Sequence, residues 1–360
     1  MIDTPTARNP TLAESFGQRN GFDTIRLLAA LAVIGSHAFP MTGREEPLFA
    51  LTGQATLGSL AVSIFFVISG LLIPMSYDRG SLSRYVTKRA KRIMPALVVA
   101  VVFCAFVLGP IFTSMPLNAY FSAKDTWRFL GQALFLPVSY DLPGVFDEHP
   151  LSTVNGSLWS LKFEIACYAL VVLALTFRPF RKISVIVAWL LSFVVVRAIP
   201  GQGTGTLFFV DQFADLFRFF GAGMIFYLFA GRIQLRAGWA WLAFAVFVAG
   251  CFTPFFLEIA CTAGAYALIV FAYGCPEWFS RLTETGDISY GVYVYGFPVQ
   301  QILVPPSLAI TASAPALAPF ANMGLAMIPV FIAGVLSWLV VEKPVMLFKP
   351  RRITRPSLAS

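Results

Sequence analysis

Repeated apolar runs, each about 20 residues long, constrain the fold of this chain more than any other feature. A run of that length crosses the hydrocarbon core of a bilayer when it forms an α-helix. Charged residues make up only 12% of the 360 residues, against about 25% in soluble domains. We therefore predict an all-α, polytopic integral membrane helix bundle of about ten transmembrane helices. The predicted spans are 22–40, 56–77, 93–113, 157–177, 183–200, 213–230, 237–255, 257–274, 286–304 and 321–341.

The basic residues lie mainly in every second connection between these spans, and six of them fall between Arg79 and Arg92. Because Lys and Arg are enriched in cytoplasmic loops, this asymmetry predicts that both termini are cytoplasmic. It also explains the net charge of +8 without a nucleic-acid partner. We expect a cytoplasmic tail at 1–21, a membrane domain at 22–344 and a basic cytoplasmic tail at 345–360.

The stretch 114–156 contains no predicted span, and its apolar segment WRFLGQALFLPV is short enough to be interfacial or re-entrant. The five cysteines fall in or beside apolar runs, where they act as small apolar residues. No CxxC or Cys/His spacing indicates a metal site. The first span has no signal-peptide cleavage pattern, so we expect it to be retained.

Arg26 and His37 lie in the otherwise apolar stretch GFDTIRLLAALAVIGSHAFPM. Ionisable residues inside a membrane are costly and usually mark a functional site. Eleven residues separate their positions, so on a helix they share one face about 16 Å apart along the axis. This arrangement suits an anionic ligand at one end and proton chemistry at the other. The alternative is an Arg that snorkels to the surface and a hydrogen-bonded core His.

Arg89 and Arg92 lie three residues apart in the basic loop, so on a helix they share a face. Two guanidinium groups in that geometry suit a phosphate group. The alternative is topology alone, with attraction to anionic lipids.

Ser157, Ser160 and Glu164 form one polar stripe on a predicted span. Glu164 and His37 both fall in the predicted outer halves of their spans, so the carboxylate is placed to orient the imidazole. A pair between Lys162 and Glu164 is the structural alternative. His149, in the acidic outer loop, is the rival histidine.

Aromatic and amide side chains mark a further polar segment. Tyr290, Tyr293 and Tyr295 suit either an interfacial belt or a polar pocket with Gln300 and Gln301. With Trp159, such tyrosines suit stacking on sugar rings. Glu342 closes the last predicted span and is interpreted as a structural ion-pair or membrane-interface residue.

Together these segments resemble the membrane acyltransferase-3 family, in family order over nearly the whole chain. The first-helix pattern DxxR…H matches Asp23, Arg26 and His37. The patterns FFVISGFL, RRxxRIxP, SLWSLxxE, ISYxxYLxHxP and VExP match 65–72, 88–95, 157–164, 288–298 and 341–344. Gly296 stands where many members carry His, and Ile165 where many carry a second acid, so the resemblance carries no catalytic role to these two positions. The chain resembles the short members without an appended esterase-like domain.

The resemblance implies an O-acyltransferase of the cell inner (plasma) membrane. Such an enzyme moves an acyl group, most often acetyl, from cytoplasmic acyl-CoA to a hydroxyl of a cell-surface or lipid-linked glycan, without a metal. The CoA phosphates are expected at Arg26, Arg89 and Arg92, and the glycan near Trp159, Tyr290 and Tyr293. His37 is expected to act as general base, with Glu164 orienting it or assisting an acyl-histidine.

Two functions of other classes stay open. A small transporter or flippase would use Arg26, His37 and Glu164 as a substrate or proton path. A structural subunit would use the same residues only to pair helices. The paired arginines favour the enzyme, because a transporter has no need of a nucleotide-phosphate site.

Overall fold

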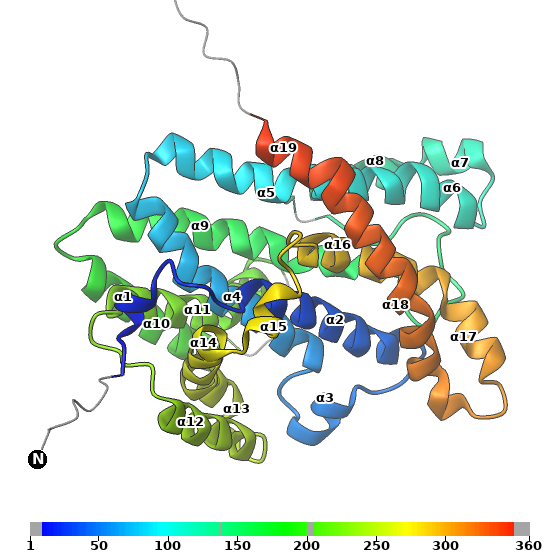
Figure 1. The fold of residues 1–360 in the computed structure, drawn as a ribbon. Coiled ribbons are helices and arrows are strands. Elements are labelled where there is room, and N and C mark those ends of the chain that lie inside the picture. Colours follow the sequence, from blue (N-terminus) through cyan, green and yellow to red (C-terminus); the bar gives the residue numbers. More distant parts are fainter. Residues whose placement is uncertain (1–8, 137, 200–204, 349–360) are drawn as a thin grey trace, which may run out of the picture.

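The computed structural model describes residues 9–136, 138–199 and 205–348, which form a bundle of helices (Figure 1). Within these ranges the only β-pairing consists of two isolated bridges, Thr11 with Gln234 and Thr113 with Val145. The predicted all-α class is therefore confirmed for the described part of the chain.

Each predicted span coincides largely with one helix or with helical segments that follow one another directly, but 237–255 runs past the end of α12 at Gly250 into a turn. Residue 200 lies outside the described residues. The bounds are α2 Phe22–Met41, α4 Leu57–Asp78, α5 Leu82–Phe103 with η1 Cys104–Leu108 and α6 Gly109–Phe112, η3 Gly156–Ser160 with α9 Leu161–Thr176, α10 Arg181–Ala198, α11 Thr206–Leu228, α12 Ala237–Gly250, α13 Phe256–Ile259 with η4 Ala260–Gly264 and α14 Ala265–Gly274, α16 Ser289–Ile302, and α18 Ala318–Leu336 with η6 Ser337–Glu342 and α19 Lys343–Leu347. The short connecting helices are α1 Leu12–Ser15, α3 Pro47–Thr52, α7 Leu117–Ser122, α8 Lys124–Phe129, η2 Leu130–Leu134, α15 Glu277–Arg281, α17 Val304–Ile310 and η5 Pro315–Leu317.

Six helices of the described chain are long and apolar enough to cross a membrane: Phe22–Met41, Leu57–Asp78, Leu82–Phe112, Gly156–Thr176, Phe256–Gly274 and Pro315–Leu347. The other four predicted spans fall short for two physical reasons. Helices α12 and α16 have only 14 residues each. Helices α10 and α11 are long enough, but each carries several charged residues: Arg181, Lys182 and Arg197 in α10, and Asp211, Asp215 and Arg218 in α11. The structure thus supports a multi-pass membrane protein with six clear spans.

Helix α4 is packed along α2 on one side and α11 on another, with α5 and α12 on opposite sides of the bundle (Figure 1). Gly70 of α4 and Gly223 of α11 let the two backbones touch. A Cβ on Gly70 would collide with the carbonyl oxygen of Phe220, and one on Gly223 with that of Val67. Small residues permit such close approach in membranes, where packing drives helix association.

We expect Gly70→Ala to lower the stability of the purified protein by about 1–3 kcal/mol, because the added methyl group forces two backbones apart. The measurement is the thermal unfolding midpoint in detergent. Gly324→Ala is the control, since a Cβ there has nothing within 4 Å. An equal loss in both variants would contradict the close contact between α4 and α11.

Part of the 114–156 stretch enters the bundle beside α16. The amide nitrogen of the Gln301 side chain donates to the carbonyls of Leu151 and Thr153, at 2.7 and 2.6 Å. Further along, the Asn155 amide donates to the carbonyl of Val294 at 3.0 Å. Residues 151–155 therefore run antiparallel to α16, from its end toward its start, and lead directly into η3 and α9.

This antiparallel path changes where α9 begins. The Ser160 hydroxyl lies 2.8 Å from the Tyr293 hydroxyl, about one turn from the start of α16. Glu164, one turn further, therefore lies at the same end of the bundle as the start of α16. The prediction that Glu164 occupies the same outer level as His37 is wrong, because the span was assumed to start at the membrane surface.

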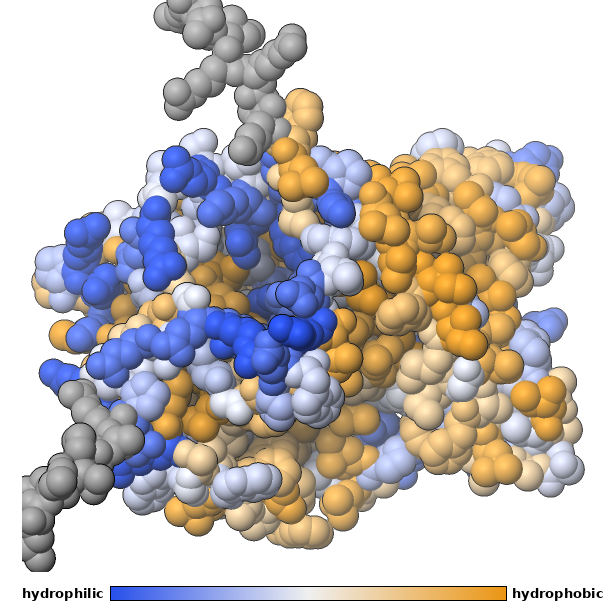
Figure 2. All heavy atoms as spheres, in the orientation of Figure 1, coloured by the Kyte–Doolittle hydropathy of each residue, from blue (hydrophilic) through white to orange (hydrophobic). Residues whose placement is uncertain are grey.

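Residues 9–21, predicted as a tail, are instead packed against the segment that follows α11. The Leu12 amide donates to the carbonyl of Ile233 at 2.8 Å, and the Leu12 side chain is fully buried. Residues 1–8 and 349–360 of the predicted tails lie outside the described residues. On the face shown in Figure 2, hydrophilic side chains gather around α15 and the loop between α4 and α5, whereas hydrophobic side chains cover α18.

Candidate functional site

A cavity of about 360 Å³ lies among α2, α4, α5, α9 and α16. Five segments that are far apart in the sequence thus meet at one place. Six of the eight predicted site residues line it: Arg26, Arg89, Arg92, Glu164, Tyr290 and Tyr293. Lys88 and Lys91 line it as well, so cations outnumber the single lining carboxylate.

Arg92 is held by two carboxylates. One guanidinium nitrogen pairs with Asp287, and the other lies 3.2 Å from Glu342, whose side chain is fully buried. Glu342 also accepts from the Ser337 hydroxyl at 2.9 Å, and the Arg92 guanidinium lies 5.6 Å from the Tyr290 ring centroid. The predicted phosphate role of Arg92 does not fit these contacts, because both ends of its guanidinium are already paired. The interpretation of Glu342 as an ion-pair residue is confirmed.

Arg89 has the opposite environment. No ion pair or hydrogen bond joins its side chain to any other described residue, and its Nε is buried without a partner. Its guanidinium lies 5.9 Å from the Tyr168 ring centroid. A buried donor without a partner is unfavourable unless a ligand or water satisfies it. Arg89 is therefore the cavity cation that is available to an anion, and Arg26 carries only a partly exposed pair with Asp23 at 3.0 Å.

Glu164 points into the cavity. Its carboxylate accepts from the Tyr168 hydroxyl and, at 3.4 Å, from the Ser69 hydroxyl. Neither predicted partner of Glu164 contacts it among the described residues: no hydrogen bond joins it to His37, and Lys162 lies over the Phe163 ring at 5.1 Å. Glu164 does not reach His37 because α9 begins inside the bundle, close to the start of α16. Glu164 therefore lies beside the cations that line the cavity.

His37 is not among the residues that line the cavity. Its ring packs edge to face against Phe297, with centroids 4.9 Å apart, and its Nδ1 is buried without a partner. Phe297 follows Tyr293 by one turn of α16, about 6 Å along the axis. The alternative of a hydrogen-bonded core histidine does not hold within the described part of the chain.

The two tyrosines of α16 make specific contacts. The Tyr290 hydroxyl donates to the carbonyl of Ile93 at 2.9 Å, and the Tyr293 hydroxyl lies 2.8 Å from Ser160 Oγ. Both therefore belong to a polar pocket and not to an interfacial belt. Trp159 does not line the cavity; its ring packs edge to face on Phe163.

His149, the rival histidine, is remote from the cavity. Its Nδ1 lies 3.0 Å from Gln301 Oε1, and its ring stacks on Phe146 at 4.7 Å. The Gln301 amide nitrogen donates to two carbonyls, so its oxygen accepts and His149 Nδ1 donates. His149 therefore ties the loop before α9 to α16.

Four site residues were missed by sequence reasoning: Ser69, Lys88, Tyr168 and Asp287. Tyr168 had a signal, because it follows Glu164 by four residues on one helix face. Ser69 lies inside the motif block 65–72, and Asp287 directly precedes the block 288–298. Only the tertiary structure shows that Ser69 contacts Glu164 and that Asp287 pairs with Arg92.

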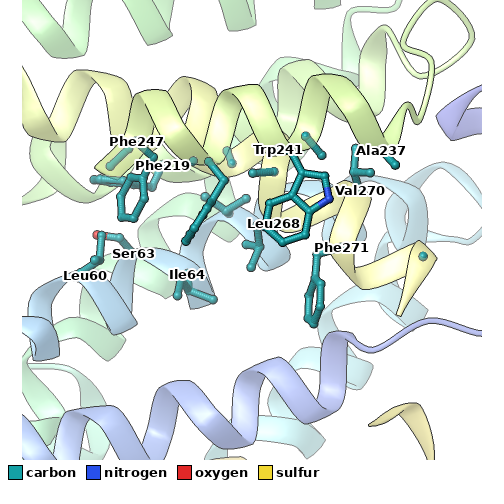
Figure 3. Close-up of a pocket in the computed structure, with 18 residues that line it drawn as sticks. Leu60, Ser63, Ile64, Phe219, Ala237, Trp241, Phe247, Leu268, Val270 and Phe271 are labelled. Carbon is teal, nitrogen blue, oxygen red and sulfur yellow. The ribbon is translucent and has the colours of Figure 1, made fainter. Parts of the chain in front are cut away.

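A larger cavity of about 640 Å³ lies between α4, α11, α12 and α14. Figure 3 shows Trp241, Phe219, Phe247 and Phe271 among the side chains that surround it. None of the described residues that line it is ionisable. This cavity suits hydrocarbon and offers no acid, base or phosphate ligand for a reaction.

Comparisons with known proteins identify the family of this chain. A sequence profile described as an acyltransferase domain matches residues 19–341. An O-acetyl transferase of Shigella phage Sf6 is 31% identical, covering 90% of this chain and 95% of the relative. Nodulation protein 10 of Rhizobium leguminosarum bv. viciae is 26% identical, with coverage of 96% and 98%. Exopolysaccharide production protein ExoZ of Rhizobium meliloti (strain 1021) is 25% identical, with coverage of 83% and 93%. No solved structure matches the chain.

Proposed function

Because this chain belongs to the acyltransferase-3 family and is an acyltransferase, we propose that it moves an acetyl group from cytoplasmic acyl-CoA to a hydroxyl of a glycan. The observation that carries the proposal is the basic cavity with the unpaired Arg89; Tyr293, which lines this cavity, lies one turn of α16 from Phe297, and Phe297 packs on His37. The proposed membrane arrangement has ten spans within 22–344 and both termini in the cytoplasm, in the inner membrane. The basic cavity then opens to the side where acyl-CoA is found.

The donor site is proposed on three side chains. Arg26, Arg89 and Lys88 line the cavity and are suited to the phosphates of the nucleotide. Arg92, fixed by its two carboxylates, positions α5 so that Arg89 faces the cavity. Glu164 offers its carboxylate to the amide groups of the pantetheine arm, which revises its expected role as the partner of His37.

The acyl-CoA thioester supplies an activated carbonyl carbon. His37 takes the proton of the acceptor hydroxyl as general base. The hydroxyl oxygen forms the new C–O bond while the C–S bond breaks, and His37 returns the proton to the departing thiolate. The products are an ester and free CoA, so atoms and charge balance.

The acceptor is proposed to be a cell-surface or lipid-linked glycan. The support is the name of one relative, which refers to exopolysaccharide production, and another named as an O-acetyl transferase. Tyr290 and Tyr293 are aromatic residues that line the cavity, whereas Trp159 does not line it and packs on Phe163.

The proposal is tested with purified protein in nanodiscs. Radiolabelled acetyl-CoA is supplied with and without a cell-envelope glycan extract, and label on glycan and free CoA are both measured. Label transferred to glycan supports the proposal. Folded protein that neither binds acetyl-CoA nor releases CoA would favour a transporter or flippase, which is then tested by vectorial uptake into proteoliposomes.

Arg89→Ala is expected to weaken acetyl-CoA binding by about tenfold or more, because one charge-assisted hydrogen bond contributes about 1.5–3 kcal/mol. Its thermal stability is expected to stay the same or rise, since a buried donor without a partner is removed. Arg84→Ala is the matched control, because Arg84 lies on the same helix but does not line the cavity. Equal weakening in both variants would mean that the loop attracts the donor only through its overall charge.

A further inference from the structure

A second basic site lies on the connection between α11 and α12. Arg232, Gln234 and Arg236 all line one groove, whereas Ile233 and Leu235 pack against the hydrophobic core. Successive side chains of an extended backbone point to opposite sides. The alternating sequence Arg-Ile-Gln-Leu-Arg therefore places two arginines on the same side of the segment, over the groove.

Hydrogen bonds hold this segment in place from two directions. The Leu235 amide donates to the carbonyl of Pro10 at 2.9 Å, and Gln234 forms an isolated antiparallel bridge with Thr11. The Tyr266 hydroxyl of α14 donates to the carbonyl of Gln234 at 2.9 Å. The backbone that carries the two arginines is therefore anchored both to the N-terminal segment and to α14.

The two arginines have no anionic partner in the described part of the chain. Arg232 and Arg236 are exposed, and no ion pair or hydrogen bond joins their side chains to another described residue. By contrast, Arg181 pairs with Asp78 at 3.3 Å. None of the described residues that line the groove is acidic. The positive charge of the groove is therefore available to an anion from outside the chain.

The groove becomes apolar along α12. Leu242, Ala243 and Val246 follow Trp239 on one face of this helix, and all four line the groove. The helix rises about 15 Å from Arg236 to Val246, which is about half of a hydrocarbon core of about 30 Å. The groove therefore has the depth of one leaflet of a bilayer, with the positive charge at one end.

The opposite wall of the groove comes from η4 and α14. Thr262 and Ala263 lie in the π-helical segment η4, and Tyr266 lies in α14. Such π-helical turns are frequent at functional sites. Trp239, which is 57% exposed, lies at the charged end, where an aromatic ring suits the boundary between membrane and water.

We propose that this groove binds one anionic phospholipid of the surrounding bilayer. Its phosphate lies between Arg232 and Arg236, and one of its acyl chains lies along α12. Guanidinium groups match phosphate geometry, and basic pockets beside membrane helices attract anionic headgroups. A soluble phosphate would use the arginines and leave the apolar part of the groove empty, whereas a phospholipid uses both parts.

The lipid comes from the leaflet on the side of the donor cavity. The Tyr227 hydroxyl donates to Asp78 at 2.7 Å, which joins the end of α11 to the end of α4. Arg232 follows α11 closely, so it lies at the same end of the bundle as the basic residues of α5. None of the described residues lines both the groove and the donor cavity, so lipid binding does not depend on the proposed acyl transfer.

The test compares labelled phosphatidylglycerol with labelled phosphatidylcholine of the same acyl chains, bound to the full-length protein in a neutral detergent. The wild type is expected to prefer phosphatidylglycerol by about 25-fold, because each arginine near a membrane surface contributes about fivefold. Arg232→Gln/Arg236→Gln is expected to lose this preference and to keep the thermal unfolding midpoint of the wild type in phosphatidylcholine nanodiscs. Ala243→Leu narrows the apolar part and is expected to weaken the binding of both lipids.

The matched control is Arg84→Gln/Arg178→Gln, because both are exposed arginines near the end of α4 and neither lines the groove. A wild type without a preference overturns the inference. An equal loss in the two double variants also overturns it, since overall charge would then attract the lipid. If inorganic phosphate displaces the label at constant ionic strength and Ala243→Leu changes nothing, the arginines hold a soluble anion and the inference is wrong.

Discussion

His37→Ala is expected to lower acyl transfer by about a hundredfold to ten-thousandfold, the range that a general base contributes. The physical reason is that Nδ1 of His37 is buried without a protein partner, so the imidazole is free to take a substrate proton. The variant is expected to keep its fold and its affinity for acetyl-CoA, because the ring makes no hydrogen bond to any described residue and does not line the basic cavity. The measurement is label transfer to glycan alongside donor binding.

The chain contains only two histidines, which provides a matched control. His149→Ala removes the hydrogen bond to Gln301 and is expected to lower stability by about 0.5–1.5 kcal/mol while transfer continues. His37→Gln, which keeps a polar side chain but not a base, is expected to be as inactive as His37→Ala. An active His37→Gln variant would place the proton transfer on another group.

Arg92→Ala is expected to lower the free energy of unfolding by about 3–5 kcal/mol, because it leaves two mostly buried carboxylates without a cation. The Asp287 side chain is 14% exposed and that of Glu342 is fully buried. The measurement is the thermal unfolding midpoint in detergent, compared with Arg89→Ala. Arg89→Ala, three positions away on the same helix, is expected to reduce donor binding but not the free energy of unfolding.

A compensating variant separates the structural role of Arg92 from a ligand-binding role. Combining Arg92→Met with Asp287→Asn and Glu342→Gln removes the cation and both anions together, and is expected to recover most of the lost stability. Donor binding in this variant is expected to stay measurable, because Arg26 and Arg89 are retained. Full stability in the single variant Arg92→Ala would show that the ion-pair network is not structural.

The sequence alone predicted the helical class, because apolar runs in a membrane must satisfy their backbone hydrogen bonds internally. It also selected the cavity residues Arg26, Arg89, Glu164, Tyr290 and Tyr293, since polar side chains in apolar segments are costly and their helical spacing assigns them to faces. The number of spans was less secure, because charge and short length in α10, α11, α12 and α16 weaken the hydropathy signal.

Only the tertiary structure decided which of these polar groups pair with one another. Arg89 and Arg92 look alike in the sequence. In the structure, Asp287 and Glu342 pair with Arg92, whereas the Nε of Arg89 has no partner among the described residues. Glu164 was assigned to His37 because the sequence does not show the level at which α9 begins. That level depends on residues 151–155, whose hydrogen bonds to α16 are long-range. Spacing within a helix is a local property that the sequence determines, whereas the depth and partners of a side chain depend on contacts between distant segments.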